Sequence, residues 1–314
     1  RARKSTAMAG LAPAWMLALG GASLWKRASP LPPPPAWSLT EPWDAQLWDA
    51  VLRHEPEMHT ACAWLMMAVG AAVVLVELGG GMQAVYGRYA SDPMAKWFGP
   101  TIPATAAWVF QESWSFTVAI AMVWFGDSAC LASFANRALG AMFLVHYSYR
   151  SFIYPLRMRG GKPMPLFINL LASAFCMFNG YLQGRLWTRM RVFSLESTAD
   201  VVYLGSGFAL WLGGWYVNLD SDAILRKLRK PGETGYKIPR GGMFEYVSGA
   251  NYLGECAEWC GYALASRLHI ACVAFAVFTL CNTGPRAYHH HQWYRAKFKD
   301  EYPEARRALI PFLL

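Results

Sequence analysis

The sequence predicts an all-α polytopic membrane protein of about seven transmembrane helices, with its C-terminal tail in the cytosol. Three observations support this fold class. The 314 residues are 55% apolar and only 16% charged, whereas soluble domains carry about a quarter charged residues. Seven apolar stretches are long enough to cross a bilayer, and the Lys and Arg residues between them are unevenly distributed.

The apolar stretches are the first of these elements, because a membrane-spanning helix needs about 20 mostly apolar residues. The predicted spans are 61–79, 104–125, 138–155, 164–184, 199–219, 247–266 and 268–284. Several spans contain polar residues, namely Glu112, His146, Asn179, Glu255 and Glu258. Polar groups in a span must face protein or water, so these residues are functional candidates.

Residues 1–60 are predicted to form an N-terminal extension, and residues 61–314 the membrane domain. Basic residues at positions 1–4 precede an apolar run over 7–25, as in a targeting or anchor segment. A proline-rich stretch over 30–35 then predicts a stiff linker. The extension is therefore interpreted as either a targeting sequence or an extra anchor.

The orientation follows from the loops. Most Lys and Arg residues outside the spans fall in the loops 80–103, 150–163 and 220–246 and in the tail after 284. Because cytoplasmic loops are enriched in Lys and Arg, these segments and the tail are predicted to be cytosolic. The net charge of +9 comes from such short loops, so no nucleic-acid partner is expected.

Familiar nucleotide motifs are missing from the sequence. No P-loop occurs, and the glycine-rich stretches 79–81 and 205–207 follow no predicted strand. Any nucleotide site would therefore be built from helix ends and loops. The seven Cys form no C-x-x-C pair and mostly lie in apolar stretches, which is typical of buried small hydrophobic residues.

The densest polar region runs over 218–251. Asn218, Asp222, Arg226 and Arg229 recur at helical spacings just after a span. This pattern is compatible with an ordinary cytosolic basic loop, or with a cradle in which Arg side chains bind polyphosphate oxygens.

Glu255 and Glu258 lie one helical turn apart, so both can face the same side of a helix. Carboxylates in a span need cations or donors, and Arg286 and the His run 289–291 are candidate partners. The His run is not expected to bind metal, because adjacent side chains diverge and no ligand set completes it.

Glu112 and Tyr147 form another candidate pair, from two different spans. Burial favours the neutral, hydrogen-bond-donating form of a carboxyl group. A tyrosine and a neutral Glu that meet in a dry cavity can together donate to a carbonyl oxygen. The alternative is a purely structural hydrogen bond between helices.

Several longer motifs carry a resemblance to a known family. Residues 149–155 read YRSFIYP and residues 159–165 read RGGKPMP, and the segments 228–266 and 286–314 follow in order. From about Tyr86 to Leu314, the chain resembles the steroid 5α-reductases, most of all the animal type 1 form. Residues 1–60 have no recognised counterpart.

The resemblance implies a seven-helix reductase that transfers hydride from NADPH to a 3-oxo-Δ4 steroid. Glu112 and Tyr147 would hold the steroid carbonyl, and Tyr86 and Trp259 would face the steroid. The implied cofactor residues are Asn218, Asp222, Arg229, Tyr236, Asn251, Glu255, Arg286, His290 and Tyr294. Some members have Arg where this chain has Leu171, so Arg159 or Lys162 is expected to take over one phosphate contact.

The resemblance further implies an enzyme of the endoplasmic reticulum membrane, surrounded by membrane lipid, that receives its steroid from the bilayer and works as a monomer. Three other functions stay open. A related membrane reductase would act on polyprenol-type or enoyl-thioester substrates. An isoprenylcysteine-type methyltransferase would not need Glu112 or Tyr147. A transporter or receptor would use its intramembrane carboxylates for ions, but no internal repeat supports it.

Overall fold

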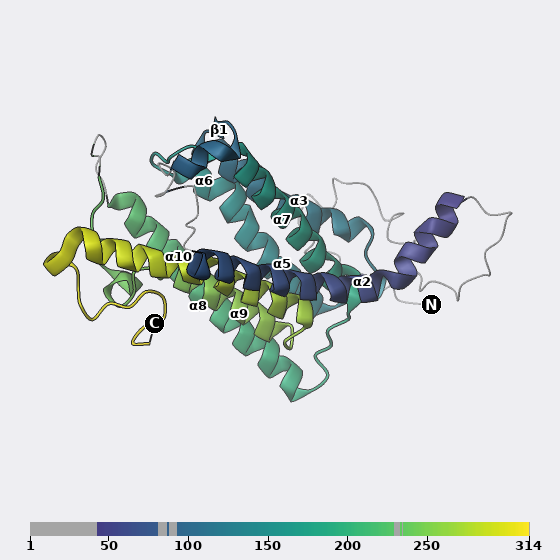
Figure 1. Ribbon diagram of the computed structural model, residues 1–314. Helices are drawn as coiled ribbons and strands as arrows, with labels where there is room; N and C mark the ends of the chain where they lie inside the picture. The colour runs from purple at the N-terminus through teal and green to yellow at the C-terminus, as the bar shows by residue number, and fades with distance from the viewer. Residues whose placement is uncertain (1–42, 81–86, 88–92, 229–232, 234, 314) are drawn as a thin grey trace.

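The computed structural model describes residues 43–80, 87, 93–228, 233 and 235–313, and this part of the chain is helical almost throughout (Figure 1). The strands within it are two short ones, β1 (Thr101–Ile102) and β2 (Met164–Pro165). They pair antiparallel, with Thr101 opposite Pro165 and Ile102 opposite Met164. The predicted all-α fold class is confirmed.

Each predicted span coincides with a helix. The α-helices are α2 (Trp43–Val74), α3 (Ala104–Trp124), α4 (Ser128–Ala132), α5 (Phe134–Ser148), α6 (Tyr154–Arg157), α7 (Leu166–Arg185), α8 (Thr198–Lys227), α9 (Ala250–Ala265) and α10 (Ile270–Phe298). π-Helical turns extend three of them, at Leu75–Gly79, Tyr149–Ile153 and Leu186–Met190. Short 3₁₀ turns lie at Pro93–Phe98, Gly242–Glu245 and Lys299–Glu301.

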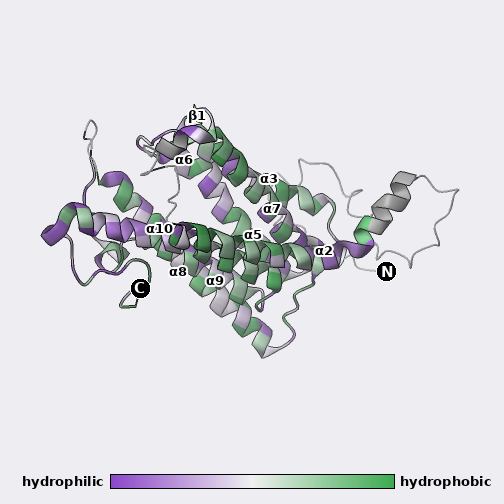
Figure 2. Ribbon diagram, in the orientation of Figure 1, coloured by the Kyte–Doolittle hydropathy of each residue, from purple (hydrophilic) through white to green (hydrophobic). Residues whose placement is uncertain are grey.

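Within the described residues, three helical segments are long and apolar enough to cross a membrane. They are Val51–Gly79, Leu166–Met190 and Ile270–Glu301. Figure 2 shows that hydrophobic residues dominate the middle of the bundle, whereas the C-terminal end of α10 is largely hydrophilic. The apolar helices thus indicate a membrane protein, and the number of seven spans stays a prediction.

The helices pack in pairs that are distant in sequence as well as neighbouring. α2 lies along α10, α3 lies along α7, and α8 lies along α9 (Figure 1). The main core is formed by side chains of α5, α7, α9 and α10, including Phe143, Leu182, Trp259 and Phe275. α5 contacts α3, α8 and α9, so it connects the α3–α7 pair to the α8–α9 pair.

The α8–α9 pair is packed through glycines. A Cβ added to Gly214 would lie 2.3 Å from the backbone nitrogen of Glu258, and one added to Gly261 would lie 2.3 Å from that of Trp211. Only glycine permits this approach of two backbones, which is typical of helix packing in membranes. The contact fixes how residues of α8 face those of α9.

The helix starts are specified locally. Ser197 and Asp200 form a capping box at the start of α8, in which each side chain accepts from the other residue's backbone N–H. Asp127 and Ser133 cap α4 and α5 in the same general way.

The predicted N-terminal extension overlaps α2, since this helix runs without interruption from Trp43 to Val74. Glu55 and His59 are buried, with exposed fractions of 5% and 2%. Glu55 pairs with Arg185, and His59 hydrogen-bonds with the carbonyl oxygen of Leu182 at 2.7 Å. The part of the extension from about Val51 therefore packs into the membrane domain.

Candidate active site

A buried arginine stands at the centre of the candidate site. Arg150, in the π-helical turn after α5, is only 9% exposed and donates from Nη1 to Asp222 of α8 at 3.3 Å. Its guanidinium lies over the rings of Trp108 and Tyr154, at 4.9 and 4.5 Å from their centroids. Two aromatic faces and one carboxylate thus stabilise the buried cation.

Three carboxyl groups from three helices surround this cation. Glu112 of α3, Asp222 of α8 and Glu255 of α9 all lie within electrostatic range of Arg150. Glu112 is half-buried and accepts a hydrogen bond from the side-chain nitrogen of Gln111 at 3.1 Å. The bundle thus brings three carboxyl groups and one guanidinium near one another in its interior.

Tyr147 lies in the same neighbourhood. It is 4% exposed, lies within electrostatic range of Glu112, and accepts a hydrogen bond from the Asn179 amide at 3.2 Å. The structure therefore brings the predicted pair Glu112 and Tyr147 together.

Trp259 and the pair His146–Glu258 lie close to Tyr147. Glu258 is fully buried and hydrogen-bonds with His146 Nδ1 at 2.7 Å. The ring of Trp259 lies 4.5 Å from that of His146 and stacks on Tyr147 at 5.9 Å. Arg286 and the His run 289–291 were the predicted partners of Glu258. The structure gives it His146 of α5 instead, so this prediction is wrong for Glu258.

The α8–α9 pair supplies the predicted cofactor residues Asn218, Asp222, Asn251 and Glu255. The side-chain nitrogen of Asn218 donates to the backbone oxygen of Asn251 at 3.0 Å. Arg226 lies within electrostatic range of Asp222, and its buried Nη1 atom has no hydrogen-bond partner among the residues that the structure describes. A buried guanidinium nitrogen with an unused donor suits an anionic oxygen.

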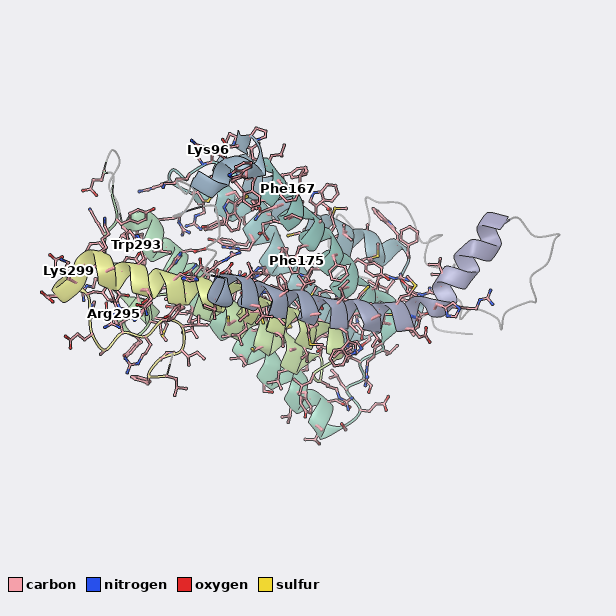
Figure 3. All side chains as sticks on the ribbon, viewed as in Figure 1. Lys96, Phe167, Phe175, Trp293, Arg295 and Lys299 are labelled. Carbon is pink, nitrogen blue, oxygen red and sulfur yellow. The ribbon has the colours of Figure 1, made fainter. Side chains whose placement is uncertain are left out.

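The remaining predicted cofactor residues lie on α10 and in the loop before α9. His290 packs on Tyr252, beside Asn251, with ring centroids 5.7 Å apart. Tyr294 stacks on Tyr302 at 5.5 Å. Tyr236 contacts Trp293 at 4.8 Å, near the hydrophilic end of α10 (Figure 3).

Arg286 contacts its own helix and the π-helical turn that follows α2. Its Nη2 donates to Asn282 at 2.9 Å, and its Nε lies 3.9 Å from Glu77. Tyr86 and Arg229, predicted for the steroid and the cofactor, lie outside the residues that the structure describes.

Sequence reasoning missed Arg150, Gln111 and Asn179 as members of this site. Arg150 was counted as a cytosolic residue of the loop 150–163, although it also lies in the predicted span 138–155. Its position four residues after His146 places both on one face of a helix, and that spacing was an available signal. Asn179 was noted only as a polar residue in a span, without a partner.

A buried cluster of carboxyls, one arginine and one tyrosine inside an apolar helix bundle defines a membrane enzyme site rather than a structural core. Comparison with known proteins specifies which. Residues 162–314 match the family described as 3-oxo-5-alpha-steroid 4-dehydrogenase.

Individual relatives extend the match over most of the chain. The protein is 49% identical over 265 residues to 3-oxo-5-alpha-steroid 4-dehydrogenase 1 of Macaca fascicularis, which covers 84% of this chain and 97% of the relative. Identity to the Mus musculus form 1 is 51% over 237 residues, or 74% and 90% of the two chains. Identity to form 2 of Rattus norvegicus is 44% over 233 residues, or 74% and 89%. The chain belongs to the 3-oxo-5-alpha-steroid 4-dehydrogenase family and is an oxidoreductase that acts on CH–CH groups.

Proposed function

We propose that this protein reduces the Δ4 double bond of 3-oxo-Δ4 steroids to 5α-dihydro steroids with NADPH. Membership of the family supports the reaction, since the named relatives are 3-oxo-5-alpha-steroid 4-dehydrogenases. The observation that carries the mechanism is that Glu112 and Tyr147, from different helices, lie within electrostatic range of each other. A carbonyl oxygen held between them would receive two hydrogen bonds.

The reaction places negative charge on that oxygen. When carbon 5 accepts a hydride, the electrons of the 4,5 double bond move through carbon 3 to the 3-oxo oxygen. Donors aimed at the oxygen lower this barrier, and loss of one donor typically costs about 10²- to 10³-fold in rate. Protonation at carbon 4, by solvent or a nearby acid, restores the ketone.

Glu112 can act as a donor only in its neutral form. Glu112, Asp222 and Glu255 all lie within electrostatic range of Arg150, and Arg226 adds a second guanidinium near Asp222. Three carboxylates and two cations still leave excess negative charge in an apolar interior, which favours a neutral form of at least one carboxyl group. Asp222 has the direct hydrogen bond to Arg150 and is therefore the best stabilised as an anion.

NADPH, when bound, supplies the hydride. The residues that we propose to hold it are Asn218, Asp222, Arg229, Tyr236, Asn251, Glu255, Arg286, His290 and Tyr294, with Arg226 added by its unused buried donor. Leu171 is 53% exposed on α7 and offers no charge, so we assign the missing phosphate contact to the exposed Arg159 or Lys162.

The topology completes the proposal. Seven spans with a cytosolic tail would place the basic segment 220–246 and the end of α10 on the side where NADPH is available. The apolar helices would let a lipid-soluble steroid enter from the bilayer. We expect a monomer in the endoplasmic reticulum membrane.

The test is NADPH consumption by the detergent-purified protein with a 3-oxo-Δ4 steroid, with the product identified by mass and ring-fusion stereochemistry. Glu112→Gln and Tyr147→Phe should each lower turnover about 10²- to 10³-fold and leave NADPH binding intact. Glu57→Gln and Tyr216→Phe, at exposed positions, are the matched controls.

Other outcomes would favour other functions. NADPH binding without steroid reduction would favour a polyprenol-type or enoyl-thioester reductase. Absence of NADPH binding would favour the methyltransferase. Normal turnover in both Glu112→Gln and Tyr147→Phe would remove the carbonyl-binding role and leave the reaction itself intact.

A further inference from the structure

The hydroxyl group of Tyr147 is held by a directional chain of buried amides. Asn179 on α7 donates from Nδ2 to the Tyr147 oxygen at 3.2 Å, and its own Oδ1 accepts from Gln183 Nε2 at 3.3 Å. Gln183 Nε2 also donates to the backbone oxygen of Ala271 on α10 at 3.0 Å. Asn179 and Gln183 are both fully buried, so water does not compete for these bonds.

The direction of this chain is set by its far end. A backbone carbonyl such as that of Ala271 can only accept, so the Gln183 amide must turn its nitrogen towards it. Gln183 Oε1 then accepts from the thiol of Cys272 at 3.5 Å. With Gln183 presenting a donor, Asn179 must present its oxygen to Gln183 and its nitrogen to Tyr147.

The direction of these hydrogen bonds limits where the Tyr147 hydroxyl can donate. A tyrosine hydroxyl has one proton to donate and an oxygen that accepts. Because the Asn179 amide occupies the oxygen as a donor, the Tyr147 proton cannot be directed at Asn179. The hydroxyl of Ser115 on α3 also hydrogen-bonds with Tyr147, and it donates to the backbone oxygen of Cys176 at 3.1 Å.

We propose that Asn179 is a positioning residue for the reaction, which directs the Tyr147 proton away from α7 so that the steroid carbonyl can accept it, and that Gln183 fixes the orientation of Asn179. This inference rests on the proposed role of Tyr147. Asn179 is fully buried on α7 and follows one turn after Phe175, which Figure 3 labels.

The test is a double-mutant cycle between Asn179→Leu and Tyr147→Phe, read as the single-turnover rate of steroid reduction at saturating NADPH. Asn179→Leu should lower this rate about 10- to 100-fold and leave NADPH affinity unchanged. In the Tyr147→Phe background, which has no hydroxyl to orient, the same substitution should have almost no further effect.

Two further variants serve as a second test and as a control. Gln183→Leu should lower the rate less than Asn179→Leu does, and again only when the Tyr147 hydroxyl is present. It replaces Asn179→Leu in the cycle if that variant does not fold. Ser173→Ala is the matched control on α7, because among the described residues this buried hydroxyl bonds within its own helix, to the Asn169 carbonyl at 2.7 Å.

The outcomes separate the two proposals. An equal rate loss from Asn179→Leu with and without the Tyr147 hydroxyl would overturn the positioning role, and so would an unchanged rate in both Asn179→Leu and Gln183→Leu. If Tyr147→Phe itself has the parent rate, the carbonyl-binding role of Tyr147 fails, and this inference fails with it.

Discussion

A buried ion pair joins the first described helix to the rest of the bundle, and its removal offers a direct test of the packing. Arg185 of α7 donates from Nε to Glu55 of α2 at 2.6 Å, and its Nη2 bonds the second carboxylate oxygen. The hydroxyl of Tyr181 donates to the same carboxylate at 3.2 Å. Glu55 and Arg185 are 5% and 3% exposed, so Glu55→Ala would leave a buried cation without its main partner.

The magnitude follows from this burial. Removal of one partner of a buried pair costs about 3–5 kcal/mol, because the other charge remains desolvated. Among the described residues, Arg185 would keep its bond from Nη1 to the Phe125 carbonyl oxygen, at 2.8 Å, and Arg189, whose Nε lies 3.7 Å from Glu55, would lose the same partner. At roughly 2–4 °C per kcal/mol, the melting temperature should fall by about 6–20 °C.

The assay is thermal unfolding of the detergent-purified protein, followed by tryptophan fluorescence. Glu57→Ala is the matched control, since Glu57 is exposed on the same helix and should change stability by no more than about 0.5 kcal/mol. The double variant Glu55→Met with Arg185→Met should recover most of the loss. Equal melting temperatures for Glu55→Ala and Glu57→Ala would refute the reasoning.

Two further predictions concern α8. Gly214→Ala should destabilise the protein by about 1–3 kcal/mol and weaken NADPH binding, because the new Cβ meets the α9 backbone. The control Gly213→Ala should be tolerated, because its Cβ would meet nothing within 4 Å. Equal melting temperatures of the two variants would contradict this packing. Arg226→Ala should raise the Kd for NADPH about 10- to 100-fold, against no change for the exposed Lys227→Ala, as measured by fluorescence titration. An unchanged Kd would show that Arg226 does not contribute to NADPH binding.

The sequence predicted where the helices lie because apolar length is a local property. It did not predict how far they extend, since polar residues can continue a helix beyond the bilayer. α8 continues to Lys227 and α10 to Phe298, past the predicted ends at 219 and 284. α2 likewise begins at Trp43, so the boundary set at residue 60 reflects a change in composition and not in secondary structure.

The candidate site was predictable where its signal was local. Glu112 and Glu258 attracted attention as carboxyls in apolar stretches, and Asn218 and Asp222 by their spacing. The pairs Arg150–Asp222 and His146–Glu258 were not predictable, because each depends on how α5 packs against α8 or α9. The glycines of α8 fix this helix against α9, and neither they nor the residue spacing of one helix specify where α5 packs.

Arg150 also connects the two halves of the proposed reaction. It bonds Asp222 on the cofactor side and lies within electrostatic range of Glu112 on the steroid side. Any ligand that changes the charge around Asp222 therefore changes the field at Glu112, and the effect must be reciprocal for binding free energies. Cofactor and steroid binding should thus be coupled through one buried guanidinium, which is held in place by Trp108 and Tyr154 and cannot leave without exposing its charge to the apolar interior.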